Sequence, residues 1–109
     1  MDDLVIVLTT LPDRAAALKL AQALVERRLA ACVNVLAECT SVYRWKGKVE
    51  NAVEVPLLIK TRAECYGDLE GAIRELHPYE LPEIIAVPVQ HGLDEYLQWV
   101  AGETSIAIG

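Results

Sequence analysis

Residues 32–60 read CVNVLAECTSVYRWKGKVENAVEVPLLIK, and this stretch decides the fold. Apolar side chains recur at every second position before and after Lys46-Gly47, which predicts two strands joined there. With a two-residue turn, the apolar side of one strand would lie beside the polar side of the other. A three-residue loop, or a two-residue turn followed by a bulge, restores the match. Because Pro56 cannot donate a backbone hydrogen bond, we expect a bulge or strand break near it.

The two strands are long for the chain that carries them. A strand of about 13 residues at about 3.3 Å per residue is roughly 40 Å long, whereas a domain of this size has a radius of gyration near ~13 Å. The hairpin tip, with Tyr43 and Trp45, should therefore extend beyond its own core. Exposed aromatic side chains on a long strand edge promote aggregation unless another chain covers them. The pattern predicts a closed homo-oligomer built around this hairpin.

The segments on either side of the hairpin predict further strands and helices. We expect strands at residues 4–10 and 83–89, helices at 11–30, 63–76 and 93–101, and a short added strand at 106–108. Thr10 and Thr61 are the expected N-caps of the first two helices. The order is βαββαβ plus a C-terminal helix, that of an α+β, ferredoxin-like fold with both crossover helices on one face of the sheet.

Composition limits the class of protein. The 109 residues fit a single domain, 1–109, and a hydrophobic fraction of 53% suffices for a core. The net charge of −6 argues against a nucleic-acid partner and against docking on an anionic membrane. Three cysteines with no CxxC pair indicate a reducing compartment, and neither a signal peptide nor a membrane span is expected. The expected location is the cytoplasm.

Few residues are obvious candidates for chemistry. The common phosphate-binding, hydrolase and zinc-protease motifs are absent, so we do not expect an enzyme. The cysteines are expected to be buried and inert, and His77 and His91 to be turn residues. Glu54, between two valines, suits either a solvated strand face or a buried pair with Lys60 or an arginine once the hairpin packs on a neighbour.

Several motifs, in order along the chain, resemble the CutA divalent-cation tolerance family. They are LAACVN at 29–34, SVYRWKGKVE at 41–50, Glu54, IKT at 59–61, HPY at 77–79 and PEI at 82–84. The resemblance implies a homotrimer assembled through edge strands, with an architecture similar to the PII signalling proteins. It also implies a link to tolerance of copper and other divalent cations, and no established enzymatic activity.

The resemblance also implies a copper site. Some family members bind copper through a cysteine in the first strand and two adjacent histidines before Pro-Tyr. Thr9, Leu76 and His77 hold those positions here, so only His77 could be a metal ligand. We expect the clefts between subunits to be lined by a set of aromatic and charged residues: Tyr43, Trp45, Glu50, Glu54, Lys60 and Tyr79.

Two other functions remain open from the sequence. The first is a PII-like sensor that binds a small anionic or nucleotide ligand in the clefts between subunits, with contacts from Lys60 and Arg62. The second is an enzyme that uses Glu50, Glu54 or His77 in those clefts, which requires these groups to converge within hydrogen-bond reach.

Overall fold

A computed structural model describes residues 3–105 as five strands, three α-helices and one short 3₁₀ helix. In chain order these are β1 (Leu4–Leu11), α1 (Arg14–Glu26), β2 (Cys32–Val35), β3 (Cys39–Trp45), β4 (Lys48–Arg62), the 3₁₀ helix η1 (Ala63–Cys65), α2 (Tyr66–Leu76), β5 (Ile85–Pro88) and α3 (Asp94–Glu103). All strand pairs are antiparallel, in the order β2-β4-β1-β5, with β3 also paired to β4. The mixed α+β class is confirmed, while the expected strand at 106–108 lies outside the described residues.

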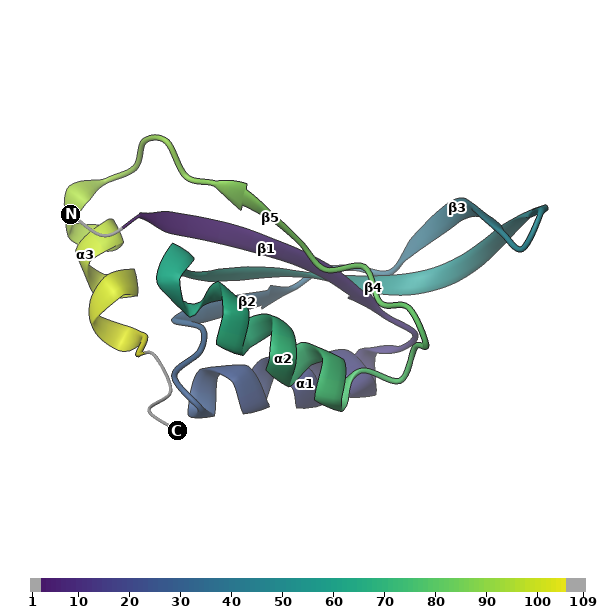
Figure 1. The fold of residues 1–109 in the computed structure, drawn as a ribbon, viewed down its shortest axis with the longest axis horizontal. Coiled ribbons are helices and arrows are strands. Elements are labelled where there is room, and N and C mark those ends of the chain that lie inside the picture. Colours follow the sequence, from purple (N-terminus) through teal and green to yellow (C-terminus); the bar gives the residue numbers. More distant parts are fainter. Residues whose placement is uncertain (1–2, 106–109) are drawn as a thin grey trace.

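The core lies between one face of the sheet and two helices. In Figure 1, α1 and α2 cover the same face, as predicted. Alternate residues of β1 and β4 point toward them, because successive strand side chains point to opposite faces. The core side chains include Val7, Leu57 and Ile59 from the sheet, Leu24 from α1 and Ile73 from α2, each 0% exposed. None of the described helices is long and apolar enough to cross a membrane.

The hairpin has a two-residue turn, and its compensating extra residue lies farther down. Trp45 pairs with Lys48, and both turn residues have positive φ, 49° at Lys46 and 82° at Gly47, as a type I′ turn requires. Closer to the core the register changes by one, so residues 36–38 oppose only Val55 and Pro56. The irregularity predicted near Pro56 is present, but it lies opposite, at residues 36–38, while β4 itself continues through Pro56. The prediction of one continuous strand through 32–45 is wrong, because β2 and β3 are separated at this point.

In the outer part of the hairpin, the apolar side of one strand therefore lies beside the polar side of the other, as a two-residue turn imposes. Tyr43 lies directly opposite Glu50, and Val42 lies opposite Asn51. Figure 1 shows β3 and the first half of β4 projecting beyond the helices, in a molecule that measures 44 × 31 × 24 Å. Val42, Val49 and Val53 are 71%, 65% and 53% exposed. The predicted overhang is present, with apolar side chains on it.

Both predicted threonine caps are wrong, because each threonine lies inside a strand. The N-cap of α1 is Asp13, whose carboxylate accepts a 2.8 Å hydrogen bond from the backbone N–H of Ala16. Thr10 belongs to β1 and donates its hydroxyl to Glu54 instead. Thr61 belongs to β4, where its fully buried hydroxyl donates a 2.7 Å hydrogen bond to the carbonyl of Leu29. Tertiary partners have thus taken both hydroxyls.

The first helix ends earlier than its apolar pattern suggests. It stops at Glu26 rather than near residue 30, because Arg28 adopts a left-handed conformation with φ of 60°. The N–H of Leu29 then bonds to the carbonyl of Leu24, and the N–H of Arg28 bonds to that of Val25. This pair of bonds is the Schellman arrangement, which closes a helix by satisfying its last carbonyls.

The second and third helices also differ slightly from their predicted limits. The segment predicted as one helix from residue 63 starts with η1 and becomes α-helical at Tyr66, and it ends at Leu76, before His77-Pro78, as expected. The last helix is shifted by one or two residues, to Asp94–Glu103, and β5 is shorter than the predicted 83–89.

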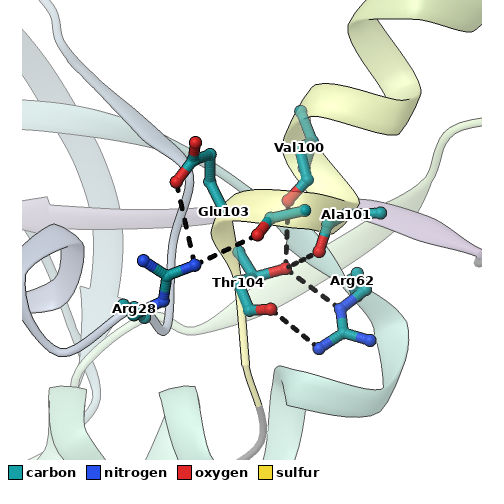
Figure 2. A network of polar contacts seen from close by, with 7 residues as sticks. Arg28, Arg62, Val100, Ala101, Glu103 and Thr104 are labelled. Carbon is teal, nitrogen blue, oxygen red and sulfur yellow. Dashed lines mark hydrogen bonds and ion pairs between the residues drawn. The ribbon is translucent and has the colours of Figure 1, made fainter.

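Two arginines fix the C-terminal end of α3 to the rest of the fold (Figure 2). The Arg62 guanidinium donates to the hydroxyl and carbonyl of Thr104, at 3.0 and 2.9 Å. Arg28 donates to the carbonyl of Gly102 at 3.1 Å, and its own carbonyl accepts from the N–H of Ser105. Helix α3 is therefore held at the end of β4 and at the turn after α1.

The middle of the sheet face turned away from α1 and α2 is apolar. We call it the uncovered sheet face and define it by Ile6, Leu8, Leu58, Ile85 and Val87, which the pairing register places on one side. The first three are half-buried, whereas Ile85 and Val87 are 51% and 43% exposed. A contiguous apolar surface of this kind is typical of an interaction site.

Two buried threonines on this sheet offer a matched test of the core. Thr61→Val should lower the free energy of unfolding by about 1–3 kcal/mol, because the Leu29 carbonyl loses its donor. Thr9→Val should change it by less than about 0.5 kcal/mol or raise it, since the Thr9 hydroxyl has no hydrogen-bond partner among the described residues. Urea unfolding at one protein concentration measures both. Equal losses of unfolding free energy in the two variants would contradict the stabilising role assigned to the hydrogen bond between Thr61 and Leu29.

Candidate functional site

A hollow lies where the hairpin leaves the sheet. We call it the hairpin hollow: Tyr43 and Trp45 of β3, Glu54 of β4 and the loop at 78–85 surround a volume of about 1140 Å³. Tyr43 and Trp45 share one side of β3 because they are two residues apart. Glu54 joins that side because it pairs directly with Cys39, which lies four residues before Tyr43.

Glu54 is the central polar group of this site. Its side chain is only 9% exposed, and its Oε2 accepts two hydrogen bonds. One comes from the Thr10 hydroxyl at 3.1 Å, and the other from the Tyr79 phenol at 2.9 Å. The carboxylate thus links the end of β1, the middle of β4 and the loop after α2.

His77 supports the same site from the core side. It is 8% exposed, and its Nδ1 accepts a 3.1 Å hydrogen bond from the backbone N–H of Tyr79. Since Nδ1 is an acceptor, Nε2 carries the proton of the neutral ring and donates it to the Thr10 carbonyl at 2.7 Å. The rings of His77 and Tyr79 also contact each other, with centroids 4.8 Å apart. Both imidazole nitrogens are therefore occupied by backbone groups.

The environment of Tyr79 changes its acidity. Burial of the phenol, together with its hydrogen bond to the Glu54 carboxylate and the nearby negative charge, raises the pKa of Tyr79 from 10.0 to about 12. Tyr79 therefore remains a hydrogen-bond donor to Glu54 across the physiological pH range.

The structure brings together four of the six residues expected in subunit clefts. Tyr43, Trp45, Glu54 and Tyr79 all line the hairpin hollow. Glu50 lies opposite Tyr43 on the exposed hairpin and does not line it. Lys60 lies six residues from Glu54 along β4, about 20 Å away at strand spacing, so the two cannot pair within one chain.

Apart from Tyr79, sequence reasoning missed the loop side of the site and its link to β1. Thr10 was assigned to a helix cap, and Glu80 and Glu83, which line the hollow, were not singled out. Pro78 and Pro82 are the available signal, because closely spaced prolines favour an irregular loop. Such a signal marks a loop without showing where it packs.

No metal site is evident among residues 3–105, in which no three His, Cys, Asp or Glu side chains are grouped to hold an ion. Thr9 is 1% exposed within the core, and Leu76 is 39% exposed at the end of α2. Neither offers a ligand for a soft cation, and His77 has both nitrogens bonded. These three residues do not fit a copper ion, and His77 as a metal ligand stays a prediction.

The fold and the site define a small α+β protein with an antiparallel sheet, three helices, a projecting hairpin and a carboxylate–tyrosine–histidine network. Residues 5–103 match the family model described as "CutA1 divalent ion tolerance protein". The chain therefore belongs to the CutA1 family. It is 46% identical over 99 residues to the divalent-cation tolerance protein CutA of Thermus thermophilus, covering 91% of this chain and 96% of that protein.

A solved structure and a human relative also match this chain. A solved structure of the divalent cation tolerance protein Cut A1 from Thermus thermophilus has a TM-score of 0.92 and 44% identity, covering 94% of this chain and 99% of that one. Human protein CutA is 48% identical over 91 residues, which cover 84% of this chain. The chain spans about half of the human protein's length, 51%.

The raised pKa of Tyr79 predicts a pH dependence of stability. Tyr79→Phe should lower the free energy of unfolding by about 1–2 kcal/mol at neutral pH, because it removes a hydrogen bond to a carboxylate. Because the folded pKa lies above the unfolded value, the wild-type advantage should be complete below pH 10.0 and lost between pH 10.0 and about 12. Urea unfolding across this range measures it.

Tyr96→Phe is the control, since Tyr96 is not among the groups that raise the pKa of Tyr79 and its phenol donates no hydrogen bond within residues 3–105. A difference between wild type and Tyr79→Phe that stays constant from pH 8 to 12 would contradict the assigned link between Tyr79 and Glu54.

Proposed function

We propose that this chain acts in tolerance of divalent metal cations as a cytoplasmic homotrimer, without catalysing a reaction. The observation that carries the proposal is the apolar overhanging hairpin beside an uncovered apolar sheet face, on a chain of the CutA1 family. Its relatives are named for divalent-cation tolerance. The free thiols of Cys32, Cys39 and Cys65 support a reducing compartment.

Self-assembly has a physical basis in the exposed apolar surface. Ile85, Val87, Val42, Val49 and Val53 are each more than two-fifths exposed. The element order and the strand order support the ferredoxin-like, PII-like description, in which subunits join through sheet edges. A cyclic trimer removes exposed edges and apolar faces together.

Thr9, Leu76 and His77 do not fit a copper ion, so the proposed metal tolerance does not depend on copper bound at these three positions. The excess of acidic residues, sixteen against ten basic ones, is compatible with cations near the surface. Copper remains the candidate metal that the family resemblance implies.

The two other functions have less support from the geometry. A sensor of anionic ligands needs cations in its cleft. Among residues 3–105, no Lys, Arg or His lines the hairpin hollow, and Arg62 is engaged with Thr104 and Glu64. An enzyme using Glu50, Glu54 and His77 needs those groups to converge. Glu50 lies out on the hairpin, and both nitrogens of His77 bond to backbone.

The oligomeric state is the first test. Multi-angle light scattering at micromolar concentration should give a mass three times the 12.0 kDa of the chain. Val53→Asp on the exposed hairpin should shift the population toward monomers, because it places a charge on an apolar contact surface. The matched control is Glu75→Asp on α2. A wild-type mass of 12 kDa would contradict the proposed trimer.

The role of His77 can be separated from metal tolerance. His77→Ala should lower the free energy of unfolding by about 1–3 kcal/mol, because the Thr10 carbonyl and the Tyr79 N–H lose their partner. It should leave Cu²⁺ affinity unchanged in calorimetric titration. Selective loss of Cu²⁺ binding by a folded His77→Ala protein would instead identify His77 as a ligand.

Tolerance itself is testable in cells. Expression in a bacterium that lacks its own copy and is sensitive to excess divalent metals should restore growth on copper. Empty vector and Val53→Asp are the controls. No rescue by a well-expressed wild-type protein, with copper, zinc and cobalt each tried, would reject the proposed function.

A further inference from the structure

Within residues 3–105, two opposite charges on β4, Glu54 and Lys60, form no ion pair. Glu54 and Lys60 both occupy even positions of this strand, so their side chains leave the sheet on the side turned away from α1 and α2. They are six residues apart, about 20 Å. The ion pairs within residues 3–105 join other residues: Arg27 with Glu75, Arg28 with Glu103, and Arg62 with Glu64.

The Glu54 carboxylate is nearly buried and held in place by hydrogen bonds. Its side chain is more than nine-tenths buried, and the hydroxyls of Thr10 and Tyr79 occupy only Oε2. Oε1 accepts no hydrogen bond from residues 3–105, and Glu80 and Glu83 add further negative charge around the hairpin hollow. A cation from another copy would stabilise this nearly buried carboxylate.

The Lys60 ammonium group is held in place by an aromatic side chain. Its Nζ lies over the ring of Tyr96, 5.8 Å from the centroid, and Tyr96 in turn contacts Trp99 with centroids 5.6 Å apart. The aromatic ring restrains the ammonium group without neutralising it. Tyr96 and Trp99 are 38% and 45% exposed, so the cation is surrounded by apolar surface that is open to contact.

We propose that Lys60 of one copy enters the hairpin hollow of the next copy and pairs with Glu54 there. The two groups are too far apart to pair within one chain, so the contact joins two different patches. Such a heterologous contact forms a ring when its rotation closes, and each copy then gives one lysine and receives one. The uncovered sheet face lies between the two patches and is buried by the same contact.

The chemistry of the site favours a lysine over a metal ion. No group of three metal-ligating side chains is found within residues 3–105. The Glu54 carboxylate beside Tyr43 and Trp45, with Glu80 and Glu83 on the rim of the hollow, suits an ammonium group. This inference rests on the proposed homotrimer and specifies the charge pair that fixes its geometry.

The test is a double-mutant cycle with Glu54→Gln, Lys60→Met and the double variant. Each single change should raise the dissociation constant of the assembly, or the rate of subunit exchange between labelled populations, by at least about 30-fold, since each leaves one charge unpaired in an interface. The double variant should be no worse than either single one. Lys60→Arg, which keeps the charge, and Lys48→Met, which removes an exposed lysine at the hairpin tip, should both stay close to wild type.

Each alternative has its own outcome. Additive losses in the double variant, or a loss with Lys48→Met as large as with Lys60→Met, would overturn the pairing while leaving the trimer intact. Butylammonium chloride tests a second alternative. If it raises the melting temperature of the wild type, and Glu54→Gln abolishes this rise without changing the assembly, the pairing is overturned and the hollow binds a free amine instead. A monomeric wild type would remove the trimer and this contact together.

Discussion

The structure depends on β4 running unbroken through Pro56. This strand of 15 residues pairs with β1, β2 and β3. Proline lacks the N–H that a central strand needs on one side. The segment between β2 and β3 accommodates the proline. Residues 36–38 leave the sheet opposite Pro56, and the N–H of Leu36 still donates to the Pro56 carbonyl. Because the irregularity lies at residues 36–38 and not in β4, β4 stays extended and carries the hairpin beyond the core.

The same irregularity determines which side chains meet in the site. Because the extra residue lies at 36–38 and not at the turn, Cys39 faces Glu54, and the side of β3 that carries Tyr43 and Trp45 also carries the carboxylate. A three-residue loop at the turn would shift β3 by one position and turn the aromatic rings to the opposite side. The hairpin hollow is thus a consequence of where the register changes.

Much of this fold could be predicted from the sequence, because alternation, helical spacing and Pro56 are local signals. The turn at Lys46-Gly47, an irregularity near Pro56 and the end of α2 before Pro78 were predicted, although the irregularity lies in the segment opposite Pro56. The helix caps were not, because Thr10 and Thr61 have partners distant in the sequence. For the site, periodicity grouped Tyr43 with Trp45, but nothing in the spacing shows that Tyr79, 25 residues from Glu54, returns to it.

The network around His77 explains why the site can persist without metal ligands. The ring joins the end of β1 to the loop after α2, and Tyr79 then carries that link to Glu54 on β4. A metal bound to either ring nitrogen would replace a part-buried hydrogen bond to a backbone group, at a cost comparable to an unmade hydrogen bond. Since Thr9 and Leu76 supply no thiolate or second imidazole, no further ligand bonds offset that cost. In this chain the histidine therefore serves to position the tyrosine, and the tyrosine to hold the carboxylate that faces the hairpin hollow.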